Sequence, residues 1–306
     1  MQILPALRRV EEAFPEEVVA IGVHSPKFAA ERDPANVAAA IRRYGIVHPV
    51  AHDPEFKLWR AYAVRAWPTL VFVAPDGSVL GQHSGEPDPE RLLAGVKDAL
   101  DGWRAGGKLK PAALLPATTP QPASRFLFPG KLKPVPGTPR RWALADSGHH
   151  QVVLLSEDGA ELARYGSGAA GRGDGAAAAA SFNGPQGLIA GDSAIYVADT
   201  GNHLIRRIEI ASGAVTTLAG TGKRGRALGA PTAALATALA SPWDLEIAGE
   251  RLFFANAGTH QLGVIDLAEA SVATLAGTGA EAIVDGPAHE AVLAQPPYTP
   301  LFSPSG

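Results

Sequence analysis

The sequence predicts an incomplete α/β domain followed by an all-β propeller of about three blades, and three observations lead to this fold class. A six-residue cassette, with Ala first, Asp or Asn second, Gly fourth and His sixth, occupies residues 145–150, 198–203 and 255–260. Such recurrence, at a spacing of fifty to sixty residues, indicates an array of identical supersecondary units. Short apolar runs flank each cassette, whereas the first hundred residues alternate apolar runs with helical patterns.

The first hundred residues predict strands and helices of an α/β domain. The run Val18–His24 is continuously apolar up to its last residue, as central strands of parallel sheets are. Two later strands, Thr69–Val73 and Ser78–Gln82, flank a tight turn at Pro75-Asp76-Gly77. Helices are expected at Pro34–Tyr44, Phe56–Val64 and Pro89–Leu100.

The repeat region predicts short strands bounded by Gly, Asp, Asn and Ser. These strands are Ala194–Ala198, Leu204–Ile210, Val215–Leu218, Leu252–Ala255 and Leu262–Leu267. A Pro-containing segment precedes each later set of strands and is here called the lead-in; these segments are 182–188, 240–245 and 294–300. A Gly-rich turn follows each set of strands. The cassette is expected to be a hairpin turn in which Asp caps the turn and Gly supplies a positive φ. About four short strands per repeat is the geometry of a propeller blade.

Several motifs carry a resemblance to a known family. YVADTGNHLIRRI, continued by GAVTTLAG up to Gly220, resembles an NHL repeat over a whole blade. RFLFPGK at 125–131, SFNGPQGL at 181–188 and SPWDL at 241–245 follow the family order. The chain thus resembles the NHL repeat-containing protein two family over almost all of its 306 residues. The resemblance implies a thioredoxin-like domain followed by a six-bladed NHL propeller.

The resemblance also implies the remnant of a redox site. Trp67, Pro68 and Thr69 precede the hairpin, where thioredoxin-like proteins have a cis-proline that lines the redox site. The family's Cys-x-x-Cys would come just before Gln2–Leu7, but the chain contains no cysteine. Thiol chemistry needs a thiolate, so the chain as given cannot perform it. A misplaced start, a fragment or loss of the thiols in this lineage would each explain this, and we favour truncation.

The domain boundaries are expected at 1–103 for the thioredoxin-like domain, 104–124 for a linker and 125–306 for the partial propeller. Residues 102–145 contain eight Lys or Arg, eight Pro and no Asp or Glu. A basic arm for nucleic acid is one interpretation, but the basic residues are scattered and few aromatics interleave. A Pro-rich, semi-rigid linker is favoured. A fourth lead-in begins at Gln295–Pro300, so three of six blades are expected, with truncation at this end too.

The repeated cassette supplies the candidate site residues. They are Asp146, Gly148, His150, Asp199, Gly201, His203, Asn256, Gly258 and His260. One His per blade could lie near the others around an axis and hold zinc or copper. A residue that recurs at a turn more often fixes that turn by hydrogen bonding, which we favour. One Asn among the three positions weakens a calcium site, and capping of the following turn is expected instead. No metal and no cofactor are predicted.

Two further patterns are assigned no chemistry. The Gly-rich turns 166–175 and 219–225 lack the strand, loop and helix with Lys-Ser/Thr that a phosphate loop requires, so they are expected to connect blades. His24, His48 and His52 fall in one region, and Ser25 with Asp53 would complete a Ser-His-Asp set. No nucleophile-elbow motif supports that set, and strand-end histidines are expected.

The composition limits the partners that we expect. The formal net charge is −3, so no global field attracts nucleic acid or an acidic membrane. No apolar run approaches the roughly 18 residues of a spanning helix, and the first ten residues do not form a signal peptide. A cytoplasmic location is expected. The predicted function is a protein-interaction scaffold that binds a protein partner or small ligand on a propeller face. The alternative is a thiol-disulfide oxidoreductase in a full-length form whose Cys-x-x-Cys lies just upstream of Met1.

Overall fold

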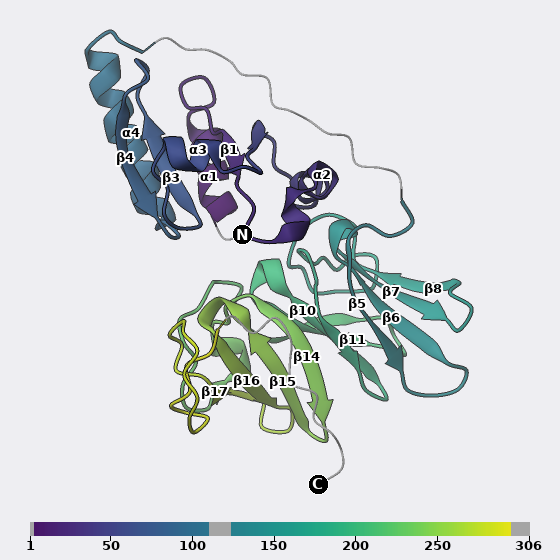
Figure 1. Ribbon diagram of the computed structural model, residues 1–306. Coiled ribbons are helices and arrows are strands. Elements are labelled where there is room, and N and C mark those ends of the chain that lie inside the picture. The colour runs from purple at the N-terminus through teal and green to yellow at the C-terminus, as the bar shows by residue number, and fades with distance from the viewer. Residues whose placement is uncertain (1–2, 110–123, 295–306) are drawn as a thin grey trace. The chain divides into compact units, whose positions relative to one another are not determined.

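The computed structural model describes residues 3–109 and 124–294, and the chain divides into two compact units, Met1–Ala123 and Ser124–Gly306 (Figure 1). Most of the linker expected over 104–124, and the fourth lead-in after Ala294, lie outside the described residues. Among the helices of the described residues, none combines the length and the apolar character needed to cross a membrane.

Over residues 3–109 the first unit forms four helices and two small sheets. Its helices are α1 (Ile3–Ala13), α2 (Pro34–Arg43), α3 (Lys57–Ala61) and α4 (Pro89–Ala105), with a 3-10 turn η1 (Ala29–Arg32). Its strands are β1 (Gly22–His24), β2 (Val50–His52), β3 (Thr69–Val73) and β4 (Val79–Ser84). Strand β1 runs parallel to β2, and β3 pairs with β4 as an antiparallel hairpin. The predicted elements therefore occur in the predicted order, and α1, η1 and β2 are additional to them.

Local sequence explains the helices of this unit. Pro34 and Pro89 begin α2 and α4, where the missing amide hydrogen costs nothing. The preceding residues, Asp33 and Asp88, accept hydrogen bonds from free amides of the first turn. The apolar face of α1 packs through Ala6 and Val10 against α4 and β3, with Leu92, Leu70 and Phe72 in the same cluster.

The strand predicted over Val18–His24 is mostly wrong. Only its last three residues form β1, and β1 pairs with β2 alone among the described strands. Val19, Ile21 and Val23 are 42%, 62% and 47% exposed, so they do not line a buried central strand. The continuously apolar run predicted a strand with a neighbouring strand on each side, whereas within the described residues β1 has one neighbouring strand, β2.

The second unit consists of three successive antiparallel sheets, here called blades 1 to 3. Blade 1 comprises β5 (Pro129–Val135), β6 (Arg141–Asp146), β7 (Gln151–Ser156) and β8 (Glu161–Tyr165). Blade 2 comprises β9 (Leu188–Ala190), β10 (Ala194–Asp199), β11 (Leu204–Glu209) and β12 (Val215–Ala219). Blade 3 comprises β14 (Pro242–Ala248), β15 (Arg251–Asn256), β16 (Gln261–Asp266) and β17 (Ser271–Ala276), with the short β13 (Thr232–Ala233) beside β17.

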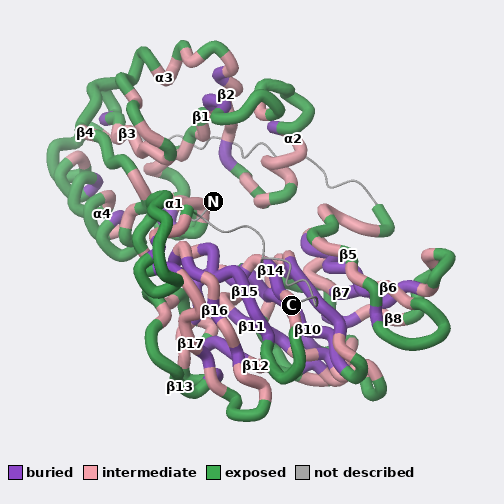
Figure 2. The backbone as a smooth tube through the Cα atoms, turned by 60° about the horizontal axis from the view of Figure 1, so that its bottom comes forward, coloured by how far each residue is buried: buried purple, intermediate pink, exposed green. Residues whose placement is uncertain are grey.

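Two core clusters of this unit lie between adjacent blades, where the strands are buried (Figure 2). Ile195 and Val197 of blade 2 pack with Val152 and Leu154 of blade 1. Their alternate neighbours on the other face of blade 2 pack with blade 3, as expected for strands buried on both faces. The Ala-rich stretch 176–180 contributes a fully buried Ala180 to the first core.

The arrangement is mostly β and resembles consecutive propeller blades. Within the described residues the three sheets stay separate ladders and do not close into a ring.

Candidate functional site

Each cassette joins the second and third strands of its blade, as the hairpin prediction required. The connection is one turn of 3-10 helix, η2 (Ser147–His149), η3 (Thr200–Asn202) or η5 (Ala257–Thr259). The expected positive φ falls on a different residue. His150, His203 and His260 have φ values of 56°, 56° and 53°, while the cassette glycines have no positive φ. The glycine prediction was therefore wrong about conformation.

The cassette glycines are required for close approach instead. The Gly201 amide donates to the carbonyl of Asn183 in the lead-in of the same blade, 2.9 Å away. A Cβ on Gly201 would lie 2.5 Å from that same oxygen, which no side chain tolerates. Gly148 and Gly258 make the same bond to Leu127 and Ala240. Glycine is thus needed because a backbone lies against it.

The second cassette position also holds the lead-in of its own blade. Oδ1 of Asp146 accepts the Leu127 amide at 2.7 Å, and Oδ1 of Asp199 accepts the Asn183 amide at 2.7 Å. The amide oxygen of Asn256 accepts the Ala240 amide at 2.9 Å. The predicted cap on the following turn is absent at all three cassettes. Because only an acceptor is needed, Asn can replace Asp here.

In blades 1 and 2 the other carboxylate oxygen of the cassette Asp forms an ion pair with an arginine. Asp146 lies 3.0 Å from Arg164, and Asp199 lies 3.1 Å from the fully buried Arg206. Arg206 also contacts Asp174 at 2.7 Å. Burial raises the pKa of Asp199, and hydrogen bonds from Asn202, the Asn183 amide and Arg206 oppose that rise.

The third blade uses neutral groups at the same place. The Asn256 amide nitrogen donates to the Thr259 hydroxyl at 2.6 Å, where blades 1 and 2 bring an arginine to the carboxylate. The change from Asp to Asn therefore accompanies the change of partner.

The cassette histidines of blades 1 and 2 join these blades to the blades that follow them. Nδ1 of His150 accepts the Gly184 amide, and Nδ1 of His203 accepts the Ser241 amide, both at 3.0 Å. Gly184 and Ser241 belong to the lead-ins of the following blades. The histidines were predicted to form hydrogen bonds within their own turns. This prediction was wrong, because each bond reaches the lead-in of the next blade.

The third cassette position supports the same joint. The Ser147 hydroxyl donates to the Pro185 carbonyl, and the Thr200 hydroxyl donates to the Pro242 carbonyl at 2.6 Å. In blade 3 the position is Ala257, and Nδ1 of His260 is buried with no partner in the described part of the chain. Nor do any three His, Asp or Glu of the described ranges cluster as metal ligands.

The histidine joints predict acid sensitivity. Burial lowers the pKa of His203, and the charge of Arg224 lowers it further; burial also lowers that of His150. Because the unfolded histidines keep a pKa of about 6.5, the unfolded chain binds protons more readily below that pH. Stability from the joints is present above about pH 6.5 and is lost as pH falls toward the folded-state values. Protonation of His203 at Nδ1 would also place its N–H against the N–H of Ser241, so the hydrogen bond between them would be lost.

The expected result is that His203→Asn loses less stability than the wild type when the pH falls from neutral into the acid range. Asn tolerates a positive φ and can accept the amide, but it does not titrate. Urea unfolding across this pH range measures the difference. His83→Asn, at an exposed position on β4, serves as control and should keep the wild-type slope. Identical slopes for all three proteins would contradict the joint.

The predicted redox remnant forms an aromatic ledge in the first unit. The Trp67–Pro68 peptide bond is cis, as the resemblance implied. The Trp67 ring lies 4.3 Å from that of Trp59, with Phe56 edge-on to both, and remains 48% exposed. Its indole nitrogen donates to the Ser25 carbonyl at 3.0 Å, and the Thr69 hydroxyl donates to the Ala66 carbonyl at 2.7 Å. The ledge is therefore fixed and partly open to solvent.

The Ser-His-Asp set does not assemble. The Ser25 hydroxyl donates directly to Asp53 at 3.0 Å, without an intervening histidine. Asp53 also accepts amides at the start of α3, including that of Trp59 at 3.0 Å. Burial by itself would raise the pKa of Asp53, but the amides of Trp59 and Leu58 and the Ser25 hydroxyl outweigh it and keep that pKa low. The Asp53 carboxylate therefore holds the first turn of α3 by accepting its free amides.

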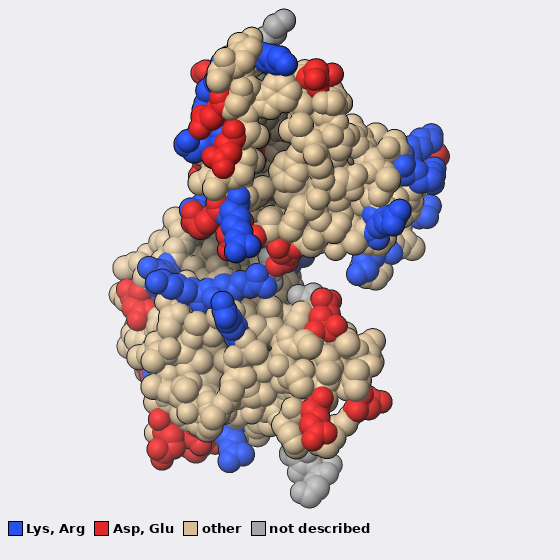
Figure 3. All heavy atoms as spheres, turned by 90° about the vertical axis from the view of Figure 1, so that its left-hand side faces the viewer, with Lys and Arg blue, Asp and Glu red and all other residues tan. Residues whose placement is uncertain are grey.

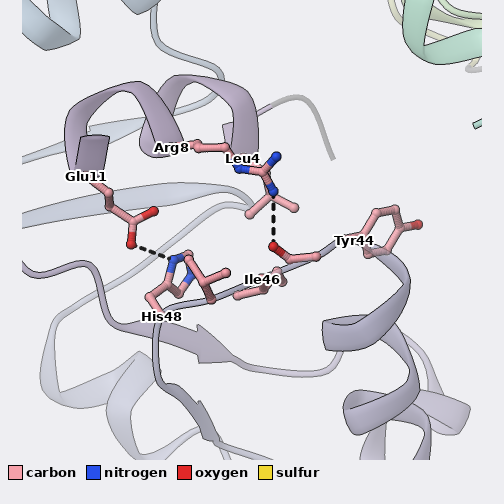
Figure 4. Close-up of a pocket in the computed structure, with 8 residues that line it drawn as sticks. Leu4, Arg8, Glu11, Tyr44, Ile46 and His48 are labelled. Carbon is pink, nitrogen blue, oxygen red and sulfur yellow. Dashed lines mark hydrogen bonds and ion pairs between the residues drawn. The ribbon is translucent and has the colours of Figure 1, made fainter. Parts of the chain in front are cut away.

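The three histidines of this region have separate positions. Nδ1 of His48 lies 3.1 Å from Glu11 of α1, beside a shallow pocket where Arg8 donates to the Gly45 carbonyl at 3.0 Å (Figure 4). These two bonds hold α1 to the segment before β2. His24 and His52 pair across β1 and β2, with ring centroids 6.1 Å apart. They are strand-end residues.

Sequence reasoning missed two ion pairs between the first strands of blades 1 and 3. Lys131 lies 2.8 Å from Asp244, and Lys133 lies 3.0 Å from Glu246. The partners are 113 positions apart, so no local pattern joins them. A signal existed, because each strand carries two like charges at a spacing of two, which places them on one face. The pairs tie β5 to β14 across the blade between them.

No protein-family model matches the chain. NHL repeat-containing protein 2 of Gallus gallus is 35% identical over 87% of this chain and 38% of its own length. Protein SUPPRESSOR OF QUENCHING 1, chloroplastic, of Arabidopsis thaliana is 33% identical over 100% of this chain and 29% of its own length. The chain thus spans 38% of the length of the first of these relatives and 29% of the length of the second.

A solved structure also overlaps part of the chain. The exposed lipoprotein thioredoxin Etrx1 of Streptococcus pneumoniae is 26% identical and covers 31% of this chain and 71% of its own, with a TM-score of 0.27.

Proposed function

We propose that the chain acts as a protein-interaction scaffold, because 87% of the chain aligns with NHL repeat-containing protein 2 at 35% identity. In this proposal the first unit is a thioredoxin-like domain, and the second is about three blades of a six-bladed NHL propeller. The partner binds the end of the blades where the cassettes and the blade connections lie. Propellers present loops of this kind on a rigid frame.

One observation carries the proposal. The polar cassette groups of blades 1 and 2 are used in bonds to lead-in segments, so these groups hold the frame together and are not available for catalysis. The connections between blades expose apolar side chains. Leu235 is 61% exposed and Ile283 is 85% exposed. Exposed apolar side chains on fixed connections favour protein contact.

The test is affinity capture from cell extract with the full chain and two paired variants. Leu235→Ser with Ile283→Ser changes the connections, while Leu132→Ser with Leu162→Ser changes exposed leucines on strands of blade 1. We expect discrete proteins to bind the wild type and the strand variant but not the connection variant. Capture no greater than on blank resin, or equal capture by both variants, would remove the proposal.

A second candidate function is thiol-disulfide exchange in a longer form of the protein with cysteines before Met1. The ledge of Trp59, Trp67 and Phe56 favours it, because a fixed, half-open aromatic surface can hold a polypeptide substrate. Insulin reduction by the full reading frame, compared with this chain, decides the matter. Activity in the longer form alone supports exchange, and activity in neither eliminates it.

A further inference from the structure

Four basic residues lie on two consecutive blade connections. Arg172 belongs to the connection after blade 1, and Lys223, Arg224 and Arg226 belong to the one after blade 2; all four are exposed. The two connections meet, because a Cβ on Gly222 would lie 2.7 Å from Nη1 of Arg172. These four residues are here called the basic patch. Figure 3 shows Lys and Arg side chains gathered in a band on one part of the surface.

The connections are held in place by backbone bonds. The Gly225 amide donates to the Leu239 carbonyl at 2.8 Å, and the Asn202 side chain donates to the Gly171 carbonyl at 2.7 Å. Arg224 donates to the Gly258 carbonyl of the third cassette at 3.3 Å. Anchoring to the cassettes lowers the entropy that the connections lose when a partner binds.

Three of the four patch residues, Arg172, Lys223 and Arg226, take part in no ion pair within the described residues. Residues 210–243 contain no Asp or Glu at all. The acid on the first connection, Asp174, is already bound to Arg206 and to the Thr217 hydroxyl. A concentrated positive region therefore stands on a chain whose formal net charge is −3.

We propose that the basic patch binds an acidic segment of a protein partner. The inference rests on the proposed function and adds the chemical class of what is bound. Carboxylates form charge-assisted hydrogen bonds with Arg and Lys, and such complementarity speeds encounter and selects partners. A nucleic acid is disfavoured because residues 166–175 and 219–230 contain no aromatic side chain on which bases could stack.

The test uses fluorescence anisotropy of a fluorescein-labelled Glu-rich peptide titrated with the full chain. We expect binding that weakens as salt is added, since screening acts on exposed charges. Lys223→Glu with Arg226→Glu should weaken binding by about tenfold or more. Arg140→Glu with Arg251→Glu is the matched control, because it changes the net charge equally at exposed positions elsewhere on this unit and should leave affinity nearly unchanged.

A second variant guards against misfolding. Lys223→Ala with Arg226→Ala removes the charges without reversing them and should give an intermediate loss at an unchanged melting temperature. The inference is overturned if the peptide does not bind, if the control pair weakens binding as much as the patch pair, or if oligo-dT binds more tightly than the peptide. Capture that depends on Leu235 and Ile283 would then still stand, so the two failures are distinguishable.

Discussion

Arg206→Met is expected to lower the free energy of unfolding by about 3–5 kcal/mol, because it leaves a buried carboxylate without its cation. Arg206 is fully buried and contacts Asp199, Asp174 and the carbonyls of Ser181 and Gly173. Methionine fills a similar volume but supplies none of these hydrogen bonds. Urea unfolding followed by circular dichroism measures the loss.

The control is the double variant Asp199→Asn with Arg206→Met. Asn at 199 can still accept the Asn183 amide, as Asn256 does with Ala240 in blade 3. Removing the buried charge together with its partner should therefore recover part of the stability that Arg206→Met loses. A double variant no more stable than Arg206→Met would show that the ion pair is not the source of the loss.

Gly201→Ala should cost about 3 kcal/mol, the scale of overpacking in a closely packed region. The added methyl would lie 2.5 Å from the Asn183 carbonyl oxygen, so the lead-in of blade 2 must move away and lose its bond to the Gly201 amide. Both bonds that hold the lead-in, to Gly201 and to Asp199, are strained by the same displacement. Urea unfolding measures the cost.

Gly229→Ala is the matched control for this change. Gly229 lies on the connection between blades 2 and 3, has no positive φ and has open space where a Cβ would stand. Its substitution should change stability by no more than about 0.5 kcal/mol. Equal effects at Gly201 and Gly229 would mean that close approach does not explain the cassette glycine.

Much of the repeat unit could be predicted because its information is local. The strands flanking Asp199 and His203 carry β-branched and apolar residues, and the observed bounds of β10, β11 and β12 differ from the predicted ones by a residue. The period of the cassette predicted three sheets, and three are present. A pattern repeated along the chain is visible without knowledge of packing.

The contacts between segments could not be predicted in the same way. The predicted Asp cap and Gly φ describe a turn in isolation, but the lead-in that presses against Gly201 comes from elsewhere in the chain. His203 finds its partner, Ser241, on the next blade. Lys131 and Asp244 meet across blade 2. In the first unit, the apolar run before β1 overstated burial because it carries no information about which neighbouring strands are present.

The cassette histidines of blades 1 and 2 join neighbouring blades through Nδ1, which leaves that atom unavailable to a metal ion. The decisive measurement is the melting temperature of the full chain after chelation and after addition of excess Zn²⁺. Nδ1 of both His150 and His203 already accepts a backbone amide, so the account predicts the same melting temperature under both conditions. A rise with Zn²⁺ that disappears in His203→Asn would contradict it.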